Sequence, residues 1–101
     1  MTSRHEGRPF LRLLECYVLH ALDSLTEPDQ AQLEAMTPKL QETFGRKGTW
    51  LEIVAAEMNF PADCPATIVR NWEANKKRAS EQGLKLSPQQ FAQFLADKWS
   101  S

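Results

Sequence analysis

A cysteine and a histidine lie one helical turn apart in the first apolar part of the chain. Cys16 precedes His20 by four residues, and Asp23 follows three residues later. On a helix this spacing places a thiol, an imidazole and a carboxylate on one flank, and all three are zinc ligands. A closed zinc site needs four ligands, and no Cys-x-x-Cys or His-Glu-x-x-His pattern supplies the rest. We therefore expect no bound metal, and a histidine beside a small, partly buried cysteine.

The other cysteine, Cys64, stands where a helix is expected to begin. Free backbone N–H groups at that position lower the pKa of a thiol, whereas the charge of Asp63 opposes this effect. No histidine lies nearby in the sequence to act as a base, so we expect packing, with an incidental nucleophile as the alternative. The sequence shows no phosphate-binding loop, serine motif or cofactor fingerprint. We predict that the chain is not an enzyme and holds no cofactor.

A run of residues with the pattern Trp-x-x-Asn-basic-basic covers residues 72–77. It resembles the recognition helix of homeodomains, in which the asparagine reads adenine and the bases hold phosphate. Glu73 departs from that family, which has a core aromatic residue there. The resemblance implies a helix-turn-helix over residues 50–79. Its candidate nucleic-acid contacts are Arg70, Asn75, Lys76, Lys77 and Arg78. The alternative is that Trp72 anchors the core and the bases are a solvated helix end.

The charges of the chain are unevenly distributed. The net charge of -1 gives no overall attraction to nucleic acid or to a membrane. Residues 23–42 carry five acids against one base, and residues 66–86 carry five bases against two acids. These segments are either two solvated helix faces, or complementary surfaces through which one copy binds another.

Aromatic residues suggest a protein-interaction role. The chain has three tryptophans, five phenylalanines and one tyrosine, which is more aromatic surface than some small bundles bury. The candidate partner-binding residues are Trp50, Trp72 and Trp99, and the alternative is that all three fill the core. Our leading hypothesis is a module that binds an unknown protein partner or forms a homodimer. Nucleic-acid binding is the second hypothesis, and we expect no membrane association.

The spacing of apolar residues predicts an all-α fold, a compact bundle of about five helices. The first helix runs from Pro9 to about Leu25, with an apolar band broad enough to be contacted from more than one side. The last helix begins with the capping motif Ser87-Pro88-Gln89-Gln90. Its apolar stripe consists of Phe91, Phe94, Leu95 and Trp99.

Caps and glycines delimit the middle helices. Thr26 begins the second helix, in which Pro38 should produce a kink or a restart with Thr37 as a new cap. The remaining boundary signals are the capping pair Thr49 and Glu52, the cap Asp63, and the stop Gly83 with Leu84 packed on it.

Length and composition predict one core. With 101 residues, 42% of them hydrophobic, the chain is too short for a second independent core. We expect a flexible N-terminal arm at residues 1–8 and a single helical domain at residues 9–101. Arg12 and Glu15 interrupt the first apolar stretch, which is therefore neither a signal peptide nor a membrane span. Without an export signal, we expect reduced cysteines and a cytoplasmic location.

Overall fold

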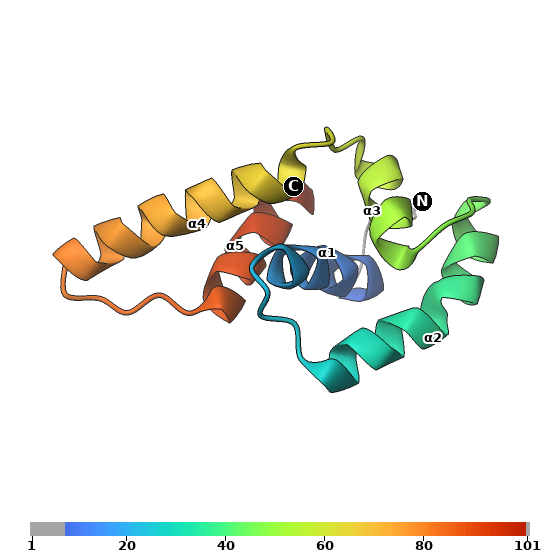
Figure 1. The fold of residues 1–101 in the computed structure, drawn as a ribbon, viewed down its shortest axis with the longest axis horizontal. Helices are drawn as coiled ribbons and strands as arrows, with labels where there is room; N and C mark the ends of the chain where they lie inside the picture. Colours follow the sequence, from blue (N-terminus) through green and yellow to red (C-terminus); the bar gives the residue numbers. More distant parts are fainter. Residues whose placement is uncertain (1–7, 101) are drawn as a thin grey trace. The chain divides into compact units, whose positions relative to one another are not determined.

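All regular structure in the described part of the chain is helical. The computed structural model describes residues 8–100, with side chains from residue 10 onward. It contains α1 (Arg8–Ala21), α2 (Glu27–Phe44), α3 (Trp50–Met58), α4 (Cys64–Glu81) and α5 (Pro88–Ser100) (Figure 1). No strand occurs between residues 8 and 100, so the predicted all-α fold of about five helices is confirmed. Of the arm predicted at residues 1–8, only Arg8 lies within the described residues, where it begins α1.

Two predicted capping motifs are present with their hydrogen bonds. At the start of α3, the Glu52 N–H donates to the Thr49 hydroxyl at 3.2 Å, and the Thr49 N–H donates to the Glu52 carboxylate at 3.0 Å. At the start of α5, the same exchange joins Ser87 and Gln90 at 3.1 and 3.0 Å. Each motif satisfies two backbone donors that the first helical turn leaves without a partner.

The end of α1 differs from the prediction. We expected this helix to reach about Leu25, but it ends at Ala21. Asp23 takes a left-handed conformation with φ of 55°, and the Ser24 N–H donates to the Leu19 carbonyl at 2.8 Å across that turn. Aspartate tolerates this conformation because its side chain is short and polar. The helix therefore stops one turn early, without a glycine.

Left-handed residues also terminate three later helices. Gly45, Asn59 and Gly83 have φ of 62°, 57° and 73°. After α4, the Leu84 N–H donates to the Ala79 carbonyl at 2.8 Å, which is the return bond of a Schellman motif. The predicted stop at Gly83 is confirmed. The Leu84 side chain does not pack back on its helix as expected, because it is 63% exposed.

Pro38 does not interrupt α2. The helix continues from Glu27 to Phe44, so the predicted restart with Thr37 as a cap is wrong. The Thr37 hydroxyl instead donates to the Leu33 carbonyl at 2.9 Å, a bond typical of a helix interior. The ribbon of α2 bends along its length in Figure 1, as expected when an internal proline removes a backbone donor.

The helices form two units, which we describe separately. Among the described residues, unit 1 comprises residues 8–24 and 63–100, and in it α1 packs against both α4 and α5. The broad apolar band predicted for the first helix is confirmed by burial on several sides of α1. Its buried side chains are Phe10, Leu13, Leu14, Cys16, Tyr17, Val18 and Leu19. They are joined in unit 1 by Cys64, Ile68, Phe91, Ala92, Leu95 and Ala96.

Unit 2 comprises residues 25–62, and in it α2 packs against α3. Its buried side chains are Leu33, Leu40, Phe44, Trp50, Ile53 and Val54. The loop between the two helices is tied to α3 by Arg46, whose Nε donates to Glu57 Oε2 at 2.6 Å. Among residues 8–100, no helix combines the length and the hydropathy needed to cross a membrane.

Candidate interaction surfaces

α4 buries side chains only in its first two turns. Cys64 and Ile68 are buried, but no side chain from Val69 to Glu81 is. Most helices in proteins gain their stability by burying an amphipathic face, which α4 does only at its start. We call residues 69–86 the basic segment. It contains five bases, Arg70, Lys76, Lys77, Arg78 and Lys85, against two acids, Glu73 and Glu81.

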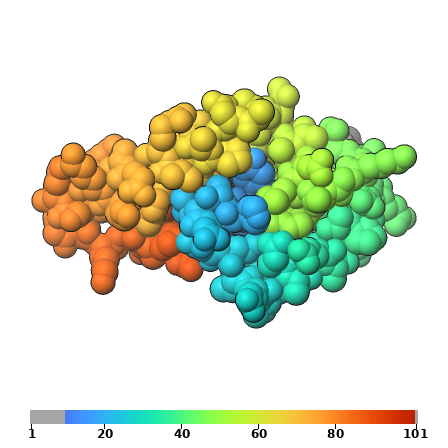
Figure 2. Space-filling model, in the orientation of Figure 1, coloured from blue at the N-terminus to red at the C-terminus, as the bar shows by residue number. Residues whose placement is uncertain are grey.

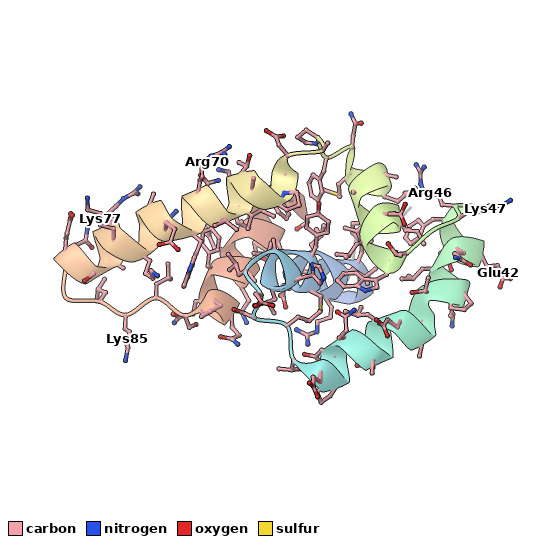
Figure 3. All side chains as sticks on the ribbon, in the orientation of Figure 1. Glu42, Arg46, Lys47, Arg70, Lys77 and Lys85 are labelled. Carbon is pink, nitrogen blue, oxygen red and sulfur yellow. The ribbon has the colours of Figure 1, made fainter. Side chains whose placement is uncertain are left out.

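The basic side chains are exposed on more than one side of this segment. Figure 3 shows Arg70 and Lys77 pointing to the side of α4 away from α5, and Lys85 pointing to the other side from the loop. Among the described residues, neither Lys77 nor Lys85 forms an ion pair. Lys76 is partly compensated, since its Nζ lies 3.5 Å from Glu73 Oε2. The face drawn in Figure 2 shows α4, in yellow to orange, uncovered along its length.

Trp72 attaches the start of the basic segment to α5. The centroid of its ring lies 5.5 Å from that of the Phe91 ring, and the two ring planes form an angle of 56°. The ammonium group of Lys76 lies 5.6 Å from the Trp72 ring centroid. The tryptophan is half-buried, and these contacts correspond to the anchoring role considered for it.

The asparagine of the homeodomain-like run is engaged with its own helix. Asn75 Nδ2 donates to the Asn71 carbonyl at 2.7 Å, so one of the two N–H groups of the amide that would read adenine is engaged within α4. Arg70 Nη2 likewise donates to the Thr67 hydroxyl at 3.1 Å. The two helices of the expected helix-turn-helix fall in different units, α3 in unit 2 and α4 in unit 1.

The other two tryptophans differ in exposure. Trp50 is 2% exposed and offers almost no side-chain surface to a partner, whereas Trp99 is half-buried near the end of α5. The most exposed large apolar residues lie elsewhere in unit 1. Phe94 is 59% exposed, although we assigned it to the apolar stripe of the last helix, and Val69 is 38% exposed. Val69 and Leu84 lie within the basic segment and add apolar groups to it, whereas Phe94 lies on α5.

Unit 2 contains a surface hollow of about 380 Å³ between α2 and the start of α3. Its lining residues are Gln30, Glu34, Thr37, Gly48, Thr49, Trp50, Leu51 and Glu52. The only charged groups among them are the carboxylates of Glu34 and Glu52, so we call it the acidic hollow. Gln30 Nε2 donates to Glu34 Oε1 at 2.8 Å, which positions that carboxylate. Hydrogen bonds from the Thr49 backbone and side chain lower the pKa of Glu52 and keep it ionised.

Comparison with known proteins gives no significant match. No family model, curated protein or solved structure is similar to this chain. The function of these surfaces must therefore be inferred from their own chemistry.

The thiols lie in apolar surroundings. Burial raises the pKa of Cys64, and the charge of Asp63 adds to this effect, whereas a hydrogen bond with Tyr17 opposes it. The pKa of Cys64 is therefore raised, although the free backbone N–H groups at the start of α4 act to lower it. Asp63 occupies the N-cap position, but its side chain makes no cap hydrogen bond. Both cysteines are buried free thiols, which are poor nucleophiles.

The possible zinc ligands Cys16 and His20 do not share an exposed surface. Cys16 is 1% exposed, whereas His20, one turn later, is exposed to solvent. Within residues 8–100, no group of three or more histidine, cysteine, aspartate or glutamate residues is arranged to hold a metal ion.

Tyr17 provides a direct test of the packing around Cys64. Burial raises its pKa from 10.0 to about 12, with Cys64 contributing further. It is the only tyrosine in the chain, so tyrosinate absorbance during an alkaline titration reports on this residue alone. We expect a midpoint near 12 in the folded protein. The folded state keeps the phenolic proton up to a higher pH than the unfolded state does. The contribution of Tyr17 to the free energy of unfolding is therefore complete below pH 10 and declines as the pH rises towards 12. A midpoint at the ordinary value would contradict the buried position.

Proposed function

We propose that this protein is an interaction module that binds an acidic protein surface through its basic segment. The observation that carries the proposal is the continuation of α4 beyond Ile68 without a single buried side chain. This exposed helix presents Lys77 and the loop presents Lys85, neither of them neutralised by an acid. Charges in such a surface orient a partner and accelerate its association, while apolar neighbours such as Leu84 supply contact area.

A protein partner fits this surface better than nucleic acid. Glu73 and Glu81 lie among the bases, and they would repel phosphates. The Asn75 amide is hydrogen-bonded to Asn71, and the exposed side chains of Val69 and Leu84 within the segment suit apolar contacts. We place the module in the cytoplasm because Cys16 and Cys64 are free thiols, as is usual in a reducing compartment.

The proposal is tested by reversing charge in the basic segment. The variant carries Arg70→Glu and Lys77→Glu, and the matched control carries Lys39→Glu and Lys47→Glu, which change the net charge equally at exposed positions of unit 2. Tagged proteins are used to capture partners from the native cell, and each captured protein is quantified. We expect the variant to capture at least tenfold less of the partner than the unaltered chain does. The control should capture as much as the unaltered chain.

Two results would contradict the proposal. Equal capture by the variant and the control would show that the basic segment does not bind the partner. Binding of the unaltered chain to mixed duplex DNA at low salt, lost in the variant and weakened by added salt, would replace the protein partner by nucleic acid. Circular dichroism of both variants checks that the helices remain folded.

A further inference from the structure

The same chain carries two surfaces of opposite charge. The basic segment presents uncompensated bases in unit 1, and the acidic hollow presents two carboxylates in unit 2. We propose that the acidic hollow of one copy receives basic side chains from α4 of a second copy. This inference rests on the proposed function of the basic segment, and it names a second copy as the partner.

The chemistry of the hollow selects a cationic occupant. Glu34 lies near the middle of α2, and Gln30 and Thr37 continue the same face one turn before and after it. Glu52 lines the hollow from α3, and hydrogen bonds with Thr49 lower the pKa of its carboxyl group. No basic residue lines the hollow to compensate the two carboxylates. A lysine or arginine from outside would supply the missing charge.

The size of the hollow fits side chains from a partner. At about 380 Å³ it lies near the lower end of the roughly 300–1,000 Å³ typical of binding pockets. It is therefore large enough for the ends of a few side chains but too small for a whole helix. Arg70 and Lys77 point to one side of α4 and are separated by two helical turns. They can approach the hollow and the adjoining acidic face of α2 together.

The remaining surface of α2 also favours a basic partner. This helix carries four acids, Glu27, Asp29, Glu34 and Glu42, against the single base Lys39. It also exposes the apolar side chain of Met36 at 36%. If each copy inserts its basic segment into the other, the two contacts are identical and close a two-fold dimer. Such a contact weakens with salt because the charges meet at a solvated surface.

The experiment measures sedimentation equilibrium of the full chain and of three variants. The first carries Arg70→Glu and Lys77→Glu, and the second carries Glu34→Lys. The third is a control with Lys47→Glu and Lys98→Glu, which changes the net charge equally at exposed positions outside α2 and outside the basic segment. We expect the unaltered chain and the control to form dimers at low salt. For each of the first two variants measured by itself, we expect a dimer dissociation constant at least tenfold higher than that of the unaltered chain. If Glu34→Lys fails to fold by circular dichroism, Glu34→Gln replaces it and should weaken the dimer less.

Mixing the first two variants provides the decisive test. In the mixture, the unaltered basic segment meets an unaltered hollow, and the reversed segment meets a reversed hollow, so we expect the dimer to return. Failure of the mixture to associate would overturn the assignment of the hollow. A monomeric unaltered chain at high concentration and low salt would overturn self-association. It would leave the proposed function standing if capture of a cellular partner still depends on Arg70 and Lys77.

Discussion

Replacing Trp50 by alanine is expected to lower the free energy of unfolding by about 3–5 kcal/mol. The side chain is 2% exposed, and the buried residues Ile53 and Val54 follow it on α3. Removing an indole of this size leaves a cavity in addition to the lost transfer free energy. Because small domains are stable by only about 5–15 kcal/mol, the change removes a large share of the total. Urea denaturation followed by circular dichroism measures it.

The matched comparison for this prediction is Trp99→Ala. Trp99 is only half-buried, so its replacement should cost clearly less than that of Trp50. A Trp50→Ala protein that unfolds like the unaltered chain but no longer captures its partner would reverse our conclusion. Trp50 would then be one of the partner-binding residues that we first considered.

The helices could be predicted from the sequence because their signals are local. The exchange of hydrogen bonds between Thr49 and Glu52 spans three residues, and so does the exchange between Ser87 and Gln90. A side chain at such a distance meets its backbone partner whenever the first turn forms. The basic residues of α4 were likewise visible in the sequence. Their exposure was not, because it depends on which neighbours cover the helix.

The predictions from the sequence fail where contacts between residues far apart in the chain determine burial and pKa. In the stripe predicted for α5, Phe91 and Leu95 are buried as expected, but Phe94 is exposed. The structure buries Ala92 and Ala96 beside them, which the prediction did not include. Apolar spacing defines a face only approximately, and packing against other helices selects its centre. Burial raises the pKa of Cys64, and a hydrogen bond with Tyr17, which lies far away in the sequence, opposes this rise. The acidic hollow has the same origin, since Glu34 and Glu52 are brought together only when α2 packs against α3.

Charge also stabilises the interior of unit 2, through a contact that the sequence did not reveal. Arg46 follows the left-handed Gly45, and its Nε lies 2.6 Å from Glu57 Oε2 on α3. The Glu57 side chain is 3% exposed, whereas that of Arg46 is 41% exposed. The pair therefore combines a buried carboxylate with a guanidinium that water still reaches. This asymmetry determines how much each partner's removal should cost.

Replacing Arg46 by methionine is expected to lower the free energy of unfolding by about 2 kcal/mol. Methionine retains much of the apolar stem but leaves the buried Glu57 carboxylate without the guanidinium. The expected loss is smaller than the roughly 3–5 kcal/mol of a fully buried pair, because solvent reaches the exposed Arg46. The matched control, Lys47→Met, changes the next residue, which is exposed, and should alter stability by less than about 0.5 kcal/mol.

A double-mutant cycle separates this ion pair from other effects of the substitutions. Glu57→Gln removes the charge while keeping the shape of the side chain, so Arg46→Met should cost less in that background than in the unaltered chain. We expect a coupling energy on the order of 1 kcal/mol, since hydrogen bonds to charged groups contribute about 1.5–3 kcal/mol before solvent exposure reduces them. Additive losses would show that Arg46 and Glu57 act independently, and that the link between the loop and α3 does not stabilise unit 2.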